Sequence, residues 1–336
     1  MASLRLAVDA MSGDHGLRSS ITATINALNQ NSALHISLVG DEPSILLALA
    51  QKKYNPEQLQ IHHSPDIVAM DEIPSKALRY KKQSSMYRVL EMLRDGHVSG
   101  VISAGNTGAL VAMSCIVLKR LSGVSRPAIC APIPAQNGYT LMLDLGANIS
   151  CDAAQLYQFA VMGASLSKAL GASDTPRLAL LNIGAELIKG PSVVKEAAEL
   201  ISADPRLNYV GFAEGNDIFS EQIDVVVCDG FTGNVALKVC EGTASFIRNQ
   251  LKTKFEQSIY GRLSAILAMP VLKAFQGEIN PDRYNGAALL GLNGVVIKSH
   301  GSSGVESFES AIHQAALAVS EGVTQSIGTQ IGTNKL

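Results

Sequence analysis

Short apolar runs alternate with helical segments along almost the whole chain. Seven runs rich in Val, Ile and Leu are predicted to be strands, at residues 4–8, 36–39, 98–102, 140–143, 178–183, 224–227 and 294–297. Between these runs, apolar residues recur at helical spacing, as with Ile21, Ile25 and Leu28. Strands that alternate with helices predict a parallel sheet with helices on both of its faces.

The longest helical pattern covers residues 233–275. It contains Gly261 and Pro270, so we expect it to break into two or three helices, because proline lacks a backbone donor. Residues 246–275 are expected to protrude from a single catalytic unit that spans residues 1–336. Residues 126–137, which contain prolines, are the weak candidate for an internal boundary.

One stretch without Asp, Glu, Lys or Arg, residues 96–118, is long enough to resemble a membrane span. Its centre at residues 103–108 is polar and flexible, which is costly in lipid. The pattern therefore predicts a buried strand, a loop and the start of a helix.

Composition and charge narrow the functional classes. The chain is 47% hydrophobic but only 5% aromatic, which favours an aliphatic α/β core. A net charge of −2 gives no indication of nucleic acid as a partner. The five cysteines form no C-x-x-C pair, and their odd number argues against a disulfide framework. With no signal-peptide pattern at the start, the cytoplasm is the expected location.

Several common functional motifs are absent. No two of the 29 glycines lie two residues apart, so G-x-G-x-x-G does not occur, and no glycine precedes a lysine as in a Walker A loop. The chain also lacks a Gly-x-Ser-x-Gly elbow, a His-Glu-x-x-His pair and a cysteine–histidine metal spacing. We therefore expect neither a cofactor nor a metal.

Six polar turns lie at the ends of predicted strands, at residues 7–15, 103–109, 143–148, 181–190, 228–234 and 296–301. One such turn alone is usually ordinary turn or capping chemistry. In a parallel sheet, however, the carboxyl ends of the strands meet at one edge, where ligands bind, so we expect all six turns to face one crevice. Small residues and helix N-termini favour an anion there, and Lys189 and Lys298 add full positive charge.

Taken in order, these turns resemble the phosphate acyltransferase family of phospholipid synthesis (PlsX), which converts acyl-[acyl-carrier-protein] and inorganic phosphate to acyl phosphate. The most similar segments are residues 104–110, 143–148, 224–234 and 291–301, within a match from Leu6 to about Ile312. The resemblance implies a three-layer α/β/α sandwich with a mainly parallel sheet, related to isocitrate/isopropylmalate dehydrogenase-like enzymes and phosphotransacetylases. The chain departs from the family's usual residues at Ser12, Leu17, Ser150 and Leu187.

Transfer to phosphate requires an anion held in line with the thioester carbonyl, a stabilised oxyanion and a thiolate leaving group. The catalytic candidates are Lys189, Asn234, His15 and His300, and the substrate-binding candidates are Ser103, Asn106, Thr107, Asp144, Asn148, Asp229 and Lys298. We expect Lys189 and Lys298 to hold phosphate, and Asn148 and Asn234 to donate to the oxyanion. Either of the two histidines could protonate the thiolate.

The resemblance also implies partners. These are acyl carrier protein, inorganic phosphate, a second copy of the chain in a homodimer, the inner face of the membrane, and the membrane glycerol-3-phosphate acyltransferase that uses acyl phosphate. Residues 263–272 are uncharged with basic flanks, which favours weak membrane contact through Leu263, Ile266 and Leu267. A helix packed on the sheet or at the dimer interface is the alternative for this segment.

Three other functions stay open from the sequence. A β-decarboxylating dehydrogenase on the related fold would need a cofactor pocket and a cluster of metal-binding carboxylates. A phosphotransacetylase would act on short acyl groups of coenzyme A. A non-catalytic membrane scaffold for a neighbouring acyltransferase would form no acyl phosphate.

Overall fold

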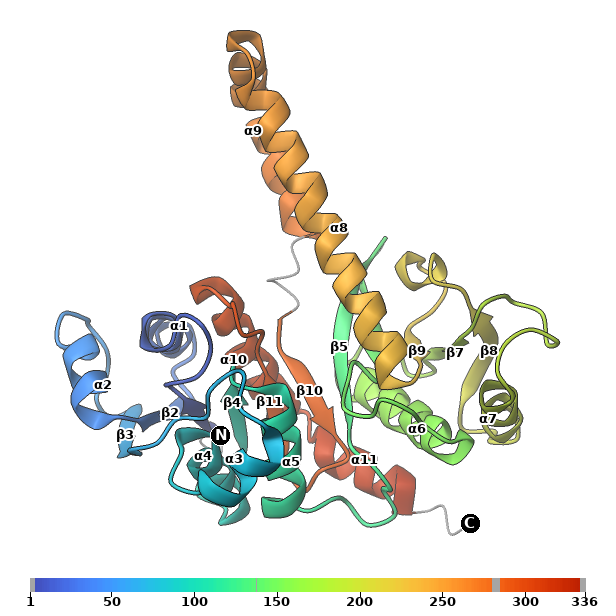
Figure 1. Cartoon of the computed structure of the whole chain (residues 1–336), viewed down its shortest axis with the longest axis horizontal. Coiled ribbons are helices and arrows are strands. Elements are labelled where there is room, and N and C mark those ends of the chain that lie inside the picture. Colours follow the sequence, from blue (N-terminus) through green and yellow to red (C-terminus); the bar gives the residue numbers. More distant parts are fainter. Residues whose placement is uncertain (1–3, 137, 280–284, 333–336) are drawn as a thin grey trace.

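One twisted sheet runs through the body of the molecule (Figure 1). The structure, a computed structural model, describes residues 4–136, 138–279 and 285–332. Within these residues the sheet has eleven strands in the order β3-β2-β1-β4-β11-β10-β5-β6-β9-β7-β8. The strands are β1 (Leu4–Asp9), β2 (Leu34–Gly40), β3 (Leu59–His63), β4 (Gly100–Ser103), β5 (Ala128–Ala135), β6 (Gly138–Leu143), β7 (Arg177–Leu181), β8 (Asn208–Ala213), β9 (Val225–Val227), β10 (Ala287–Leu290) and β11 (Val295–Lys298).

Helices cover both faces of this sheet. They are α1 (Leu17–Gln30), α2 (Glu42–Leu49), α3 (Pro74–Tyr80), α4 (Ser85–Arg94), α5 (Thr107–Val117), α6 (Ala153–Ala169), α7 (Ser192–Ser202), the 3₁₀ helix η1 (Asp217–Phe219), α8 (Gly230–Glu256), α9 (Ile259–Ile279), α10 (Val305–Ser320) and α11 (Val323–Gly332). One apolar cluster joins the sheet to α1, α6 and α10, and a second joins it to α4 and α5. The three-layer α/β/α prediction is therefore confirmed.

All seven predicted strands are present, as β1, β2, β4, β6, β7, β9 and β11. Residues 96–118 form β4, a loop and α5, as predicted. The weak boundary at residues 126–137 is wrong, because most of this segment is β5 in the middle of the sheet. Strand β5 contains two prolines, Pro132 and Pro134, which made it hard to predict because proline cannot donate to a sheet ladder.

The sheet is mixed, and its antiparallel pairs determine at which edge of the sheet each loop lies. Strand β10 pairs antiparallel with both β11 and β5, and β5 pairs antiparallel with β6. Strands β6, β9 and β7 therefore run opposite to β1, β4 and β11. The expectation that all six polar turns share one edge is wrong, because the carboxyl ends of these two groups of strands point to opposite edges of the sheet.

Helices α8 and α9 form a hairpin that rises from the body (Figure 1). The chain reverses at Gln257 and Ser258, where the Ser258 hydroxyl accepts a hydrogen bond from the Gly261 N–H at 2.9 Å. Neither predicted breaker ends a helix: Gly261 lies in the first turn of α9, and Pro270 lies inside α9. A serine that caps the first turn marks the boundary instead.

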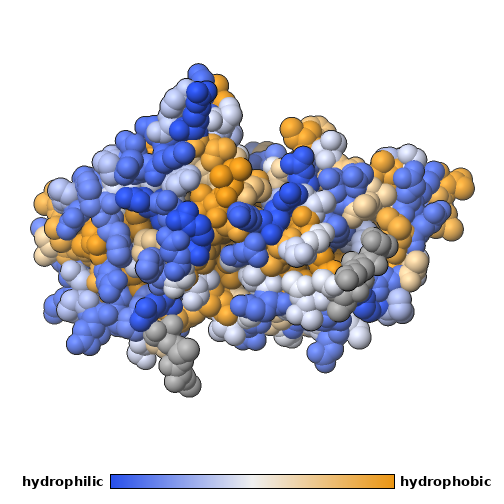
Figure 2. All heavy atoms as spheres, turned by 90° about the horizontal axis from the view of Figure 1, so that it is seen from below, coloured by the Kyte–Doolittle hydropathy of each residue, from blue (hydrophilic) through white to orange (hydrophobic). Residues whose placement is uncertain are grey.

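The body of the molecule also exposes apolar surface. Figure 2 shows hydrophobic residues gathered in a band across the middle of the face seen from below, with mainly hydrophilic residues on both flanks. Among the helices that the structure describes, none is both long and apolar enough to cross a membrane.

Candidate active site

The loops after β1 and β4 are joined through a buried carboxylate. Asp9 is 1% exposed, and its Oδ2 accepts a hydrogen bond from Ser103 Oγ at 2.7 Å. Burial raises the pKa of Asp9, although hydrogen bonds from serine hydroxyls oppose the change. Ser12 donates to the Asp9 carbonyl at 2.8 Å and accepts from the Ala104 N–H at 2.9 Å. Ser12 therefore ties the two loops together.

Lys298 ends β11 beside these loops. It is 8% exposed, and its Nζ donates to the carbonyl oxygens of Ala104, at 3.4 Å, and Ser299. Burial lowers the pKa of Lys298 to about 8, and the nearby charge of Lys238 contributes, while Asp9 opposes the change. A buried ammonium that remains mostly charged at neutral pH is suited to binding an anion.

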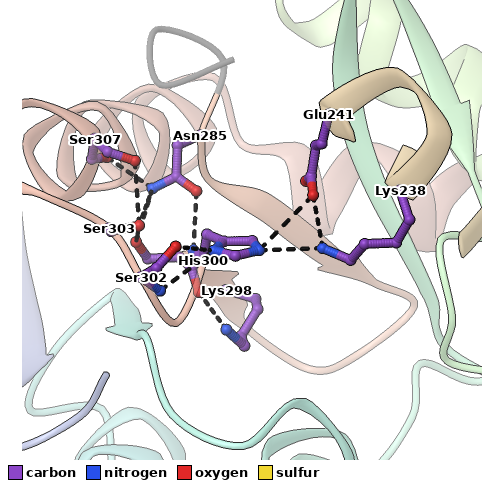
Figure 3. Close-up of polar contacts among 9 residues, drawn as sticks. Lys238, Glu241, Asn285, Lys298, His300, Ser302, Ser303 and Ser307 are labelled. Carbon is purple, nitrogen blue, oxygen red and sulfur yellow. Dashed lines mark hydrogen bonds and ion pairs between the residues drawn. The ribbon is translucent and has the colours of Figure 1, made fainter. Parts of the chain in front are cut away.

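His300 lies at the centre of a polar cluster (Figure 3). Its backbone N–H donates to Asn285 Oδ1 at 3.0 Å, and its ring Nδ1 lies 2.9 Å from Ser302 Oγ. Its Nε2 lies 3.1 Å from Nζ of Lys238, which lies 2.7 Å from Glu241 Oε2. Burial, and then the charge of Lys238, lower the pKa of His300, so its neutral form is favoured. This charge state disfavours His300 as the acid for the thiolate.

The N-terminus of α5 lies directly after Ser103. The side chain of Asn106 caps this helix, accepting from the Ala109 N–H at 2.9 Å, and its amide donates to the carbonyls of Met70 and Glu72. Its polar atoms thus have structural partners, whereas Thr107 is exposed in the first turn. The free backbone donors of that turn can bind an anion.

His15 is exposed in the loop after β1. The neighbouring Asp14 N–H donates to the Gly301 carbonyl at 2.8 Å, which joins this loop to the loop that carries His300. The structure thus brings Ser103, Lys298 and His300 together and places His15 beside them.

The loop after β6 has a structural role. Asp144 is completely buried and accepts hydrogen bonds from the backbone N–H groups of Ile129, Ala147 and Asn148. The Asn148 amide donates to Asp144 Oδ2 at 2.9 Å and to the Pro127 carbonyl at 2.8 Å. Burial raises the pKa of Asp144, and these bonds oppose the change. Both side chains are occupied in holding their own loop.

Helix α8 links the two groups of loops. Asp229 caps it, accepting from the N–H of Thr232 at 2.9 Å and from its hydroxyl at 2.7 Å. Asn234, one turn further on, lies against Gly146 of the loop after β6, where a side chain on the glycine would come within 3.5 Å of it. Lys238 follows one turn later and reaches His300. The helix thus connects Asn234 with the cluster.

Lys189 lies apart from these residues in the loop between β7 and α7. Its Nζ lies 2.8 Å from Glu186 Oε2, in an exposed ion pair. The hydrogen bond with Glu186 raises the pKa of Lys189. Within the described ranges, no hydrogen bond or ion pair joins Lys189 to the cluster around His300.

The sequence prediction missed four members of the cluster: Lys238, Glu241, Asn285 and Ser302. Lys238 and Glu241 follow Asn234 by four and seven residues, so the three share one face of α8. This helical spacing could have indicated that Lys238 and Glu241 belong to the site, but the prediction considered mainly the turns after strands.

Burial makes three of the cysteines poorly suited to act as nucleophiles. Burial raises the thiol pKa of Cys130 and Cys228, and it raises that of Cys151 to about 12, so thiolates are disfavoured at all three. In the part of the chain that the structure describes, no three His, Cys, Asp or Glu residues are placed to hold a metal ion.

Solved structures share this fold at low sequence identity. A phosphotransacetylase from Streptococcus pyogenes matches with a TM-score of 0.64 at 17% identity, covering 95% of this chain and 94% of its own. A branched-chain phosphotransacylase from Enterococcus faecalis matches with a TM-score of 0.60 at 15% identity, covering 94% of this chain and 99% of its own. At these identities the likeness establishes the fold, which is that of the phosphotransacetylases.

Sequence relatives define the family. A family model described as "Fatty acid synthesis protein" matches residues 4–326. A phosphate acyltransferase from Hydrogenovibrio crunogenus is 46% identical over 329 residues, 98% of each chain, and one from Pseudomonas putida is 49% identical over 327 residues, 97% of each chain. The chain belongs to this phosphate acyltransferase family and is an acyltransferase. The predicted resemblance is confirmed.

Proposed function

We propose that the enzyme transfers a fatty acyl group from the thioester of acyl carrier protein to inorganic phosphate, for phospholipid synthesis. The observation that carries this proposal is the buried ammonium of Lys298, which lies where the loops after β1, β4 and β11 meet. His300, in the loop that follows Lys298, and the exposed first turn of α5 add polar groups on the same side. The family relationship supplies phosphate as the acceptor that this basic site would bind.

In the proposed reaction, a phosphate oxygen attacks the thioester carbon. The new C–O bond forms, the C–S bond breaks, and the thiolate leaves with the electron pair. Lys298 and the N-terminus of α5 orient the phosphate, and Asn234 donates to the oxyanion. The lowered pKa of His300 disfavours it as proton donor, and the exposed His15 stays the other candidate. Lys189 stays a candidate for binding the incoming substrate.

An apolar cavity of about 230 Å³ suits the acyl chain. Its lining includes Gly286 and Ile297, the sequence neighbours of Asn285 and Lys298, although the side chains of Ile297 and Lys298 point to opposite faces of β11. Other parts of the lining are aliphatic residues of α6 and α10, such as Leu166 and Ala318. This lining favours a fatty acyl chain over an acetyl group.

The hairpin carries exposed apolar residues that a partner would cover. Leu263, Ile266 and Leu267 are 57%, 67% and 84% exposed, so this part of α9 is not packed on the sheet. They lie close to the reversal of the chain, with Arg262 beside them, which supports weak contact with an anionic membrane.

A homodimer contact is proposed for α8, where Phe246 is 62% exposed. An enzyme placed in the cytoplasm at the inner face of the membrane could pass acyl phosphate to the membrane glycerol-3-phosphate acyltransferase. The proposed membrane contact of α9 and the proposed homodimer contact of α8 both rest on apolar surface that is exposed to solvent in a single chain.

Substrate preference tests this proposal. The purified protein is given phosphate with either palmitoyl carrier protein or acetyl-CoA, and release of free thiol is measured. We expect faster release from the palmitoyl thioester. Preference for acetyl-CoA would support a phosphotransacetylase, and phosphate-independent release would contradict both functions. Turnover of hydroxy acids with NAD would support the dehydrogenase alternative.

A further inference from the structure

We propose that Lys238, on α8, is a phosphate-binding residue of this active site, oriented by Glu241 and His300. The inference rests on the proposed function and adds a residue from the hairpin to its phosphate site. Helix α8, which forms one arm of the hairpin, would therefore also bind substrate directly.

The contacts of Lys238 hold its ammonium in place and leave it one donor. Nζ lies 2.7 Å from Glu241 Oε2, one helical turn away, and 3.1 Å from His300 Nε2 (Figure 3). An ammonium has three N–H donors, and these two acceptors use two of them. Since the side chain is 51% exposed, the third donor is accessible to a ligand.

The position of His300 is itself fixed. Its ring lies between Lys238 and Ser302, and its backbone N–H binds Asn285. In the neutral tautomer whose Nδ1–H donates to Ser302 Oγ, Nε2 is free to accept from the ammonium of Lys238. Lys238 is therefore held from two sides, which reduces the conformational entropy lost when a ligand binds.

The charges around the cluster favour an anion. The positive charge of Lys238 acts on both Lys298 and His300, so the two ammonium groups lie close enough to repel one another. The acidic groups that oppose this effect at Lys298 are Asp9 and Asp14. A phosphate dianion bound beside both lysines would relieve their repulsion, which makes two ammonium groups more effective than one.

The helical spacing places the candidate oxyanion donor and the proposed phosphate-binding residue on one face of α8. Asn234, the candidate oxyanion donor, precedes Lys238 by one turn of α8. A phosphate held by Lys238 and Lys298 would then lie near the carbonyl that Asn234 stabilises. In this arrangement the helix would align the attacking phosphate with the thioester carbon.

Steady-state kinetics of Lys238→Met test the assignment. Lys252 provides a matched control, because it lies on the same helix, is exposed and pairs with Glu256 at 4.0 Å. We expect Lys238→Met to raise the KM for phosphate about tenfold, from loss of a charge-assisted contact. The KM for acyl carrier protein should change less than about twofold, and Lys252→Met should resemble the wild type.

Two further measurements separate binding from a structural effect. Lys238→Arg keeps the charge and should recover most of the phosphate affinity. Removal of the Lys238 charge should also move the basic limb of kcat/KM for phosphate to higher pH, because that charge lowers the pKa of Lys298.

An unchanged KM for phosphate in Lys238→Met, or an equal rise for both substrates, would overturn the assignment. An unshifted basic limb in this variant would also count against it. If the wild-type protein forms no acyl phosphate at all, the proposed function fails instead, whatever the variants do.

Discussion

Replacement of Lys298 by methionine is predicted to abolish phosphate use while making the folded protein more stable. The side chain is buried, and its pKa is lowered from 10.5 to about 8. Each pKa unit corresponds to about 1.4 kcal/mol, so burial of the charged form costs roughly 3 kcal/mol. Methionine removes this cost but cannot donate to the carbonyls of Ala104 and Ser299. Allowing about 1 kcal/mol for each lost bond, the net gain at pH 7 is about 1 kcal/mol.

The pH dependence of this gain identifies its source. In the unfolded chain Lys298 stays protonated up to about pH 10.5, whereas the folded protein releases the proton near pH 8. Below pH 8 both states are protonated and the full cost is present. Between these values unfolding takes up a proton, so the stability of the wild type rises with pH. By pH 9.5 the wild type should have regained about 2 kcal/mol, which removes the advantage of Lys298→Met.

Urea unfolding in phosphate-free buffer at pH 7 and pH 9.5 measures both effects, with Lys252→Met as the control that should show neither. Acyl phosphate formation is assayed on the same preparations. A Lys298→Met protein that is clearly less stable at pH 7, or a difference that does not change with pH, would refute the electrostatic reasoning. Wild-type activity in this variant would remove Lys298 from the site.

Three further predictions follow from the remaining candidates. Lys189→Ala should fold and lose about tenfold or more in turnover if Lys189 contacts substrate, and near wild-type turnover would remove it from the site. Cys228→Ser should keep most activity, because burial disfavours the thiolate; an acyl group trapped on Cys228 would establish a covalent route instead. Glu at both Ile266 and Leu267 should abolish salt-sensitive binding to anionic liposomes and spare activity in solution, whereas unfolded monomers would place these residues in a dimer core.

The sequence predicted the strands whose residues are β-branched and apolar, and it missed those without that pattern. β9 is Val-Val-Val and was found, whereas β10 is Ala-Ala-Leu-Leu and β5 contains two prolines. The missed pair β5 and β10 reverses the direction of the strands that follow. Their pairing joins residues far apart in sequence, such as Ala288 and Cys130, which no local pattern reveals.

The candidate site was predicted in part for the same reason. Ser103 and Lys298 end the parallel strands β4 and β11, His300 follows β11, and the structure brings the three together. Lys238 enters the cluster from a helix that begins at the opposite edge of the sheet, so the strand-end rule could not find it. Asn106 matched the expected turn chemistry, but its side chain is occupied as a helix cap.

Formation of labelled acyl phosphate tests the central claim most directly. The purified enzyme is incubated with palmitoyl carrier protein and phosphate labelled with oxygen-18, and the product is analysed by mass spectrometry together with the free carrier thiol. We predict palmitoyl phosphate that retains all of the phosphate label, formed in equal amount to the released thiol. Thiol release with no labelled acyl phosphate would contradict direct attack by phosphate and the function proposed for this site.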